Sequence, residues 1–212
     1  GCWHLGRQIV KWCEQYQLKI CVSAPQFAGR VFRHHFMTSP IKRPPAMVTT
    51  AALYSYHGGK NSCVAKPGRY EHVRELDITS AYPEAMTKLP NFSSGTWRRV
   101  SAYAGVHGLY RMSGRVQPCP WGCLFGHDFK PLAGAVRGVW VTGWELEEAM
   151  RAGEYLPGPG QVWGYVFEEA PTLEANPFVA FVKEFFHKKD CASSPQEAFF
   201  YKLLLNSTYG KL

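Results

Sequence analysis

An acid stands next to a predicted helix start in residues 77–83, which read Asp-Ile-Thr-Ser-Ala-Tyr-Pro. The segment Tyr70–Ile78 predicts a strand that delivers Asp77 at its end, and residues 80–88 predict a short helix with Ser80 as its cap. The first N–H groups of a helix lack intrahelical partners and attract phosphate. Mg²⁺ takes carboxylate and phosphate oxygens together, so the pattern is compatible with a metal–phosphate site. Taken alone, a capped turn without chemistry is the favoured interpretation, because anion sites at helix ends are common.

A second group of polar side chains lies in residues 202–210, Lys-Leu-Leu-Leu-Asn-Ser-Thr-Tyr-Gly. On a helix, spacings of four and three residues place Lys202, Asn206 and Tyr209 along one stripe, and we expect Phe199 and the three leucines to turn into packing. The lysine ammonium suits a triphosphate, and the other two side chains suit a base and a sugar. Gly210 allows another backbone, such as a duplex, to approach. The alternative is an ordinary amphipathic helix with a solvated face.

The elements that must position these groups are helices and short strands. Residues 105–166 are rich in Gly, Pro, Trp and Val, which predicts several strands and turns. One helix interrupts them, with Thr142 as its cap, Glu145 in its first turn and Gly153 at its end. Residues 176–212 predict two further helices. The sequence therefore predicts an α+β fold.

Composition narrows the class of partner. The 24 Lys and Arg residues exceed the 16 Asp and Glu residues, and the resulting net charge of +8 suits a polyanion. The seven cysteines are odd in number and scattered, which indicates a reducing compartment, the cytoplasm of a host cell or the interior of an organelle. No apolar run reaches the roughly 18 residues of a membrane span, so we expect no membrane partner.

Three smaller groups of residues admit a functional and a structural interpretation. Cys119, Cys123 and His127 have the spacing of three zinc ligands but no obvious fourth, so turn cysteines are the favoured interpretation. Three lysines near the junction of the last two helices suit a triphosphate, although a solvated helix face is favoured; they are Lys183, Lys188 and Lys189. Acidic residues at positions 145, 147 and 148 are accounted for by the dipole of their helix.

The two chemical patterns together resemble a known family. The pattern D-x-x-S-x-Y-P at Asp77, followed much later by K-x-x-x-N-S-x-Y-G at Lys202, is similar to motifs A and B of family B DNA polymerases. Residues 56–59, Tyr-His-Gly-Gly, resemble the Y-x-G-G element that protein-primed members place between their exonuclease and polymerase domains. The resemblance extends from Tyr56 to Leu212, and residues 1–50 are compatible with the end of an exonuclease domain.

This resemblance implies a role for each matching residue. Asp77 would be the catalytic and metal-binding aspartate of a Mg²⁺ site, assisted by the Ile78 carbonyl. The residues implied to bind the incoming dNTP are Ser80, Ala81, Tyr82, Lys202, Asn206 and Tyr209, with Tyr82 as a steric gate beneath the sugar. The residues implied to bind the DNA primer-template are Tyr56, Gly58, Gly59, Ser207 and Gly210. A terminal priming protein is the further partner that the resemblance implies.

The resemblance also implies a division of the chain into four parts. Residues 1–50 would end an exonuclease-like domain, and residues 51–104 would carry the Y-x-G-G element and a partial palm whose antiparallel sheet holds Asp77. Residues 105–167 would form a β-rich insertion in the region that meets the terminal protein, and residues 168–212 a helical fingers hairpin.

Residues 1–212 contain no motif C, where the family carries its second essential aspartate. We therefore expect a fragment that does not polymerise by itself. The alternative function is a non-catalytic nucleic-acid-binding module on a polymerase scaffold, and a D-x-D pair downstream of Leu212 would favour the enzyme.

Overall fold

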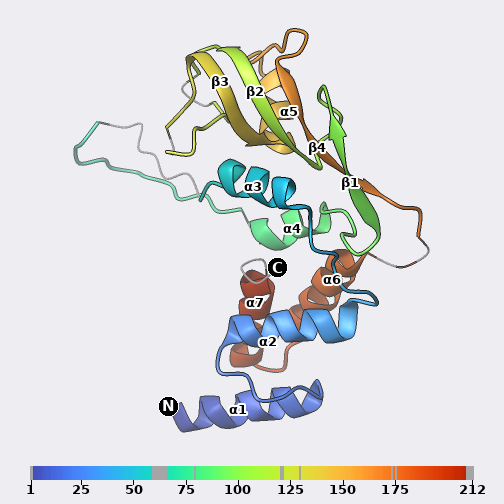
Figure 1. The fold of residues 1–212 in the computed structure, drawn as a ribbon. Coiled ribbons are helices and arrows are strands. Elements are labelled where there is room, and N and C mark those ends of the chain that lie inside the picture. The colour runs from blue at the N-terminus through green and yellow to red at the C-terminus, as the bar shows by residue number, and fades with distance from the viewer. Residues whose placement is uncertain are drawn as a thin grey trace. The chain divides into compact units, whose positions relative to one another are not determined.

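The computed structural model describes residues 2–58, 66–78, 80–119, 122–128, 130–172, 174 and 176–208. Contacts divide the chain into two compact units (Figure 1). The helical unit joins residues 1–41, 75–94 and 171–212, and the sheet unit joins residues 42–74 and 95–170. Because the chain crosses between the units four times, each unit is built from segments far apart in the sequence.

The helical unit packs its helices around an aromatic core. Its elements are α1 (Cys2–Gln15), α2 (Ala24–Val31), the π-helical turn η1 (Phe32–Phe36), α4 (Ala81–Thr87), α6 (Pro177–Asp190) and α7 (Pro195–Thr208). Phe32, Phe181 and Phe185 are fully buried, and Trp12 of α1 stacks on Phe200 of α7. Each buried large apolar side chain contributes about 1.5–3 kcal/mol. Residues near the amino terminus and the last two helices therefore share one core.

Asn176 joins two distant segments of this unit. Its side-chain oxygen accepts a hydrogen bond from the Phe178 amide at 2.9 Å and caps α6, while its side-chain nitrogen donates to the Leu89 carbonyl at 2.8 Å. Leu89 directly follows the turn that ends α4. One side chain thus starts α6 and ties it to the segment that follows Asp77 and α4.

The sheet unit contains a four-stranded antiparallel sheet in the order β1-β4-β2-β3 (Figure 1). Its elements are α3 (Ala46–Ser55), β1 (Gly95–Val100), β2 (Gly108–Val116), β3 (Gly134–Thr142), α5 (Gly143–Arg151) and β4 (Val162–Glu169). Tyr110, Met112, Val141 and Leu146 are fully buried between the sheet and α5. Helix α3 also contacts β2 and β3.

The predicted α+β class is confirmed, and so are the strands of the 105–166 region and the last two helices. The helix that interrupts the strands is confirmed at its cap, because Thr142 and Glu145 form a capping box at the start of α5. The sequence prediction missed β1.

The predicted strand at Tyr70–Ile78 is wrong, and with it the expectation that a sheet holds Asp77. Residues 73–78 have no strand pairing, and the sheet is built from residues 95–169. His72 has a left-handed backbone with φ 57°, which interrupts an extended run. Leu76 is 93% exposed, so the apolar positions of the segment bury no face that would hold it in a sheet.

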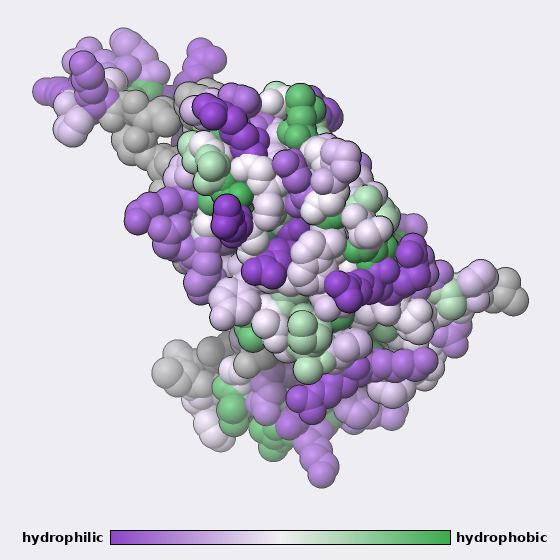
Figure 2. Space-filling view, turned by 45° about the horizontal axis from the view of Figure 1, so that its top comes forward, coloured by the Kyte–Doolittle hydropathy of each residue, from purple (hydrophilic) through white to green (hydrophobic). Residues whose placement is uncertain are grey.

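The surface is mostly hydrophilic on the face that Figure 2 shows, with separated apolar patches between charged and polar side chains. None of the helices in the described ranges is long and apolar enough to cross a membrane.

Candidate functional site

Asp77 lies on an exposed, extended segment of the helical unit, immediately before α4. Both Asp77 and Ile78 are exposed to solvent, and Ile78 is 77% exposed. The Asp77 carboxylate is therefore accessible to a cation, and the position before a helix agrees with the prediction. The carboxylate is delivered by an open segment and not by a strand end.

Ser80 starts α4 by its backbone and not by its hydroxyl. Its φ of 57° and ψ of 40° are left-handed, its side chain makes no capping hydrogen bond, and its carbonyl accepts the Glu84 amide at 3.0 Å. The prediction of a side-chain cap is therefore wrong, because the left-handed turn replaces the extended conformation that a capping hydroxyl needs. Ala81 is exposed, Tyr82 is 53% exposed, and Pro83 is buried in the first turn.

Helix α7 presents an exposed stripe that contains the predicted polar residues. Lys202 and Asn206 are both exposed one turn apart, and Ser207 beside them is half-buried. The expectation that Phe199 packs inward is wrong, since it is 65% exposed on the same stripe. Of the three leucines, Leu203 is 37% exposed and the other two are buried in the helical core. Tyr209 and Gly210 lie outside the described residues.

The two chemical patterns belong to the same compact unit. Helix α4, which follows Asp77, packs on α6 and contacts α7, which carries Lys202. Helices from segments far apart in the sequence therefore pack together within this unit.

The lysines of α6 are largely engaged within the protein. Lys188 donates to the Tyr16 hydroxyl at 2.8 Å and to Glu184 at 2.6 Å. Burial lowers the pKa of Lys188, but these hydrogen bonds outweigh that effect and raise the pKa above its ordinary value. Lys189 pairs with Asp190 at 3.3 Å, while Lys183 is exposed. Lys188 therefore links α6 to the turn that follows α1, a role that neither sequence interpretation foresaw.

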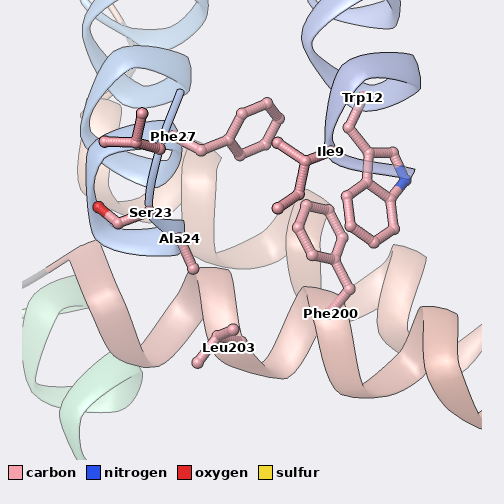
Figure 3. A pocket seen from close by; sticks show the side chains of 8 residues that line it. Ile9, Trp12, Ser23, Ala24, Phe27, Phe200 and Leu203 are labelled. Carbon is pink, nitrogen blue, oxygen red and sulfur yellow. The ribbon is translucent and has the colours of Figure 1, made fainter. Parts of the chain in front are cut away.

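An apolar cavity of about 220 Å³ lies between α1, α2 and α7 (Figure 3). Its lining side chains, apart from the Ser23 hydroxyl that caps α2, are apolar, and Figure 3 shows Trp12, Phe27 and Phe200 around it. A triphosphate needs cationic and donor groups, so this cavity is not a nucleotide site.

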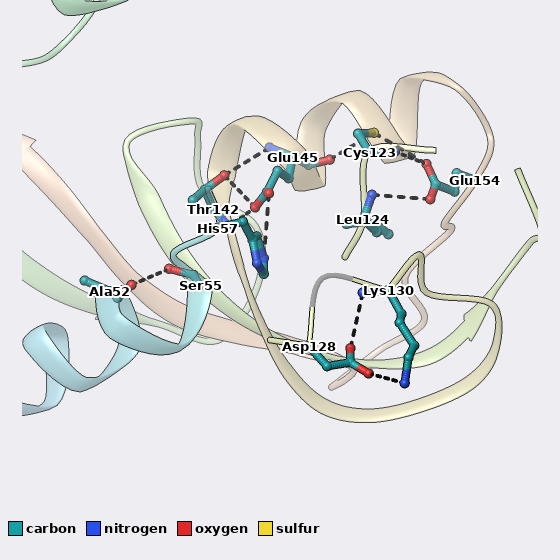
Figure 4. A network of polar contacts seen from close by, with 10 residues as sticks. All are labelled: Ala52, Ser55, His57, Cys123, Leu124, Asp128, Lys130, Thr142, Glu145 and Glu154. Atoms are coloured by element: carbon teal, nitrogen blue, oxygen red, sulfur yellow. Dashed lines mark hydrogen bonds and ion pairs between the residues drawn. The ribbon is translucent and has the colours of Figure 1, made fainter. Parts of the chain in front are cut away.

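The predicted template-binding residues Tyr56 and Gly58 line a cavity of about 480 Å³ in the sheet unit. Between them, His57 is turned toward α5, with Nε2 3.9 Å from Glu145 Oε1 and only 10% of the His57 side chain exposed (Figure 4). Tyr56 itself is 71% exposed. The buried His57 therefore anchors the segment while its neighbour faces solvent. Gly59 lies outside the described residues.

Glu145 serves two purposes at once. Its Oε2 accepts hydrogen bonds from the backbone N–H and the hydroxyl of Thr142, both at 2.8 Å, which closes the capping box of α5. Its other oxygen faces His57 (Figure 4). The capping box is visible in the sequence as T-x-x-E, but nothing in the spacing indicates the partner that lies so far upstream.

The cysteine region is organised by a buried carboxylate. Glu154, only 3% exposed, accepts hydrogen bonds from the Cys123 amide at 3.0 Å and the Leu124 amide at 3.4 Å (Figure 4). Burial and the neighbouring Glu154 raise the pKa of the Cys123 thiol to about 12. No group of three or more His, Cys, Asp and Glu suited to a metal occurs among the residues that the structure describes.

Comparison with known proteins gives two kinds of match. Residues 130–212 match the model of the family described as DNA polymerase type B, organellar and viral. This range contains Lys202 and Asn206 but begins after Asp77. No curated protein sequence matches the chain.

The fold is similar to that of phi29 DNA polymerase. A binary complex of that enzyme with primer-template DNA aligns with a TM-score of 0.61 at 14% identity, over 95% of this chain and 37% of the other. A ternary complex with primer-template DNA and incoming nucleotides aligns with a TM-score of 0.58 at 15% identity, over 95% of this chain and 38% of the other. The chain thus spans well under half the length of that polymerase. The family match supports the resemblance to type B DNA polymerases over residues 130–212, and the structural matches show a shared fold.

Proposed function

This chain has the fold of part of a type B DNA polymerase, and we propose that it is part of a DNA-directed DNA polymerase that adds nucleotides from dNTPs to a primer by two-metal nucleotidyl transfer. Protein priming is the initiation route that the Y-x-G-G element favours. The observation that carries the proposal is the shared helical unit, in which α4, next to Asp77, contacts α7, which exposes Lys202 and Asn206.

The donor chemistry of Asp77 and Ile78 suits Mg²⁺. The exposed Asp77 carboxylate and the Ile78 carbonyl are hard oxygen donors, the type of ligand that Mg²⁺ prefers. They supply only part of a ligand set. When bound, Mg²⁺ neutralises charge on the phosphoryl oxygens in transfer. Asp77 is the catalytic residue of this proposal because it would hold that charge next to the reacting phosphate.

The remaining nucleotide contacts are divided between two helices. At the start of α4, the backbone N–H groups of Ser80, Ala81 and Tyr82 would donate to the phosphates. The Ser80 side chain makes no capping hydrogen bond, so it does not compete with the phosphates for these N–H groups. On α7, Lys202 would neutralise the triphosphate, while Asn206 and Tyr209 would contact the nascent base pair. Positioning and charge stabilisation account for catalysis of this kind, because the protein forms no covalent bond to the nucleotide.

Photo-crosslinking of an azido-dNTP to the chain tests the nucleotide site. We expect crosslinked peptides from α4 and α7, protection by unlabelled dNTP, and at least a several-fold loss of labelling in Lys202→Gln, because one phosphate charge is no longer neutralised. Lys11→Gln on α1, another exposed lysine of the same unit, is the matched control. Labelling that depends equally on both lysines would contradict the site.

Primer extension tests the prediction that catalysis needs a second aspartate, which residues 1–212 do not supply. Two-metal transfer needs a second carboxylate to hold both ions, so residues 1–212 with Mg²⁺ and dNTPs should extend no primer. Clear extension by this chain would refute our account of the second aspartate. A longer protein that includes motif C should extend the primer and lose that activity on Asp77→Asn.

Tyr82 is proposed as the sugar gate. It lies in the first turn of α4 and is 53% exposed, which suits a residue that lies beneath the sugar of a bound nucleotide. In an active longer protein, Tyr82→Val should admit ribonucleotides with little loss of dNTP incorporation. Sugar discrimination equal to that of the parent protein would remove this role.

The template contacts are proposed at Tyr56, Gly58, Gly59, Ser207 and Gly210, and the duplex partner is a DNA primer-template. The exposed ring of Tyr56 suits stacking against a base or a sugar. A terminal priming protein and a reducing interior, in a host cell or an organelle, complete the proposal. An assay that compares initiation on a protein hydroxyl with initiation on a nucleic-acid 3′-hydroxyl decides the priming route.

A further inference from the structure

The sheet of the sheet unit has two unlike faces. Along each strand, alternate residues point toward α5 and form the buried core, among them Tyr110, Met112, Val141 and Val162. The intervening residues point to the other side. The strand register brings five of these into a continuous group, which we call the arginine–aromatic face; it consists of Arg99, Arg111, Trp140, Trp163 and Tyr165.

The register places arginines and aromatic rings in alternation on this face. Arg99 of β1 lies opposite Tyr165 of β4, and Arg111 of β2 lies between Trp163 of β4 and Trp140 of β3. The Arg99 guanidinium lies 5.1 Å from the Trp163 ring centre, and that of Arg111 lies 6.0 Å from it. Trp140 meets Trp163 edge-on at 5.3 Å. The rings are half-buried and the two arginines exposed, so the face is both supported and accessible.

The Arg111 guanidinium is held in place by the backbone. Its Nε donates to the Gly138 carbonyl at 3.1 Å, next to the irregularity in the pairing of β2 with β3. Gly138 has a φ of +68°, and a Cβ built there would come within 2.7 Å of the Arg111 side chain. A glycine at this bulge therefore leaves the space that the guanidinium occupies, and the cation is preorganised.

Neither Arg99 nor Arg111 of this face forms an ion pair in the part of the chain that the structure describes. Arg98, the neighbour of Arg99 on the opposite face, differs in that its Nε lies 2.6 Å from a Glu168 carboxylate oxygen. The attraction of Arg99 and Arg111 is therefore available to an anionic partner.

Alternating guanidinium groups and aromatic rings fit one chemical class of partner. Phosphates pair with arginine, and the flat faces of nucleobases stack on Trp and Tyr. A duplex conceals the faces of its bases within its own stack, whereas a single strand presents them. We propose that the arginine–aromatic face binds single-stranded DNA, with bases on the rings of Trp140, Trp163 and Tyr165.

This inference rests on the proposed function for the identity of the nucleic acid, since a template has a single-stranded part ahead of synthesis. It adds a contact surface that none of the motif residues supplies. All five residues belong to the sheet unit, whereas Asp77 and Lys202 belong to the helical unit. The two sets of residues can therefore be tested separately.

Fluorescence anisotropy of a labelled 20-nucleotide oligo(dT) with residues 1–212 tests the proposal. Loss of one stacked base in Trp163→Leu should weaken binding about tenfold. Arg99→Gln and Arg111→Gln should each lower the slope of log affinity against log salt by about 0.7, the value for one phosphate contact on a single strand. Arg98→Gln removes the same charge from the adjacent position on the opposite face and should leave the slope unchanged.

Three results would overturn the inference: no oligonucleotide binding by the chain, equal effects of Arg98→Gln and Arg99→Gln, or tighter binding of a blunt duplex of the same length. The two arginine variants keep the test valid if Trp163→Leu fails to fold, which circular dichroism reports. Nucleotide crosslinking through Lys202 without oligonucleotide binding would retain the proposed function and remove this surface. Oligonucleotide binding through Arg99 and Arg111 without nucleotide crosslinking would retain this surface and remove the proposed function.

Discussion

Removing the Glu145 carboxylate should separate two contributions that this side chain makes to the sheet unit. One carboxylate oxygen closes the capping box with Thr142, and the other faces His57 at 3.9 Å. Glutamine can replace glutamate in a capping box because its carbonyl oxygen still accepts hydrogen bonds. Glu145→Gln therefore removes the charge and keeps the cap, whereas Glu145→Ala removes both.

The expected magnitudes follow from the geometry. The His57–Glu145 pair is mostly buried but separated by 3.9 Å, so its contribution should be about 0.5–1 kcal/mol. Loss of a helix N-cap interaction costs about 0.5–2 kcal/mol. We therefore expect Glu145→Gln to reduce the free energy of unfolding by about 1 kcal/mol and Glu145→Ala by about 2 kcal/mol.

Urea unfolding followed by circular dichroism measures these values, and a double-mutant cycle with His57→Gln isolates the pair. Glu148→Gln is the control, because Glu148 pairs with Arg151 and should show no coupling to His57.

Two results would refute this reasoning. Equal stability of Glu145→Ala and Glu145→Gln would mean that the capping box contributes nothing to the sheet unit. A coupling energy of zero would mean that His57 does not interact with Glu145, and the segment at Tyr56–Gly58 would then need another anchor.

Two further predictions concern the cysteines and the helical unit. The pKa of about 12 leaves almost no Cys123 thiolate near pH 8, so iodoacetamide should alkylate Cys123 far more slowly than the exposed Cys191. The substitution Glu154→Gln should accelerate the alkylation of Cys123, and equal alkylation rates for the two cysteines, measured by peptide mass spectrometry, would contradict the prediction. Asn176→Ala removes the α6 cap and the hydrogen bond to the Leu89 carbonyl, so it should lower the free energy of unfolding in urea by about 2 kcal/mol. Asn176→Ser keeps the cap and should lower it by about half as much, and equal losses in the two variants would contradict a contribution from the Leu89 hydrogen bond.

Local patterns in the sequence predicted the features that depend on neighbouring residues. The T-x-x-E capping box at Thr142 and the exposed pair Lys202 and Asn206 on α7 were both predicted, because helix caps and helix faces follow from spacings of three and four residues. The same reasoning failed at Phe199, since which face of an amphipathic helix is covered depends on the helices that pack against it.

Strand formation was the weakest prediction because a strand needs a partner. The segment Tyr70–Ile78 has β-forming residues but no neighbour, while β1 pairs with β4, whose residues come much later in the chain. When two strands far apart in the sequence pair, the local residue pattern of neither strand indicates its partner.

The sequence by itself determined the family resemblance, the α+β class and the residues with the chemistry of a metal–phosphate site, because these depend on residue type and short spacing. Only the tertiary structure decided that residues 1–41 share a core with α6 and α7, that His57 faces Glu145, and that Arg99, Arg111 and Trp163 form one face. Each of these depends on contacts between segments that meet only when apolar surfaces are buried together, and residue spacing along the chain does not record such contacts.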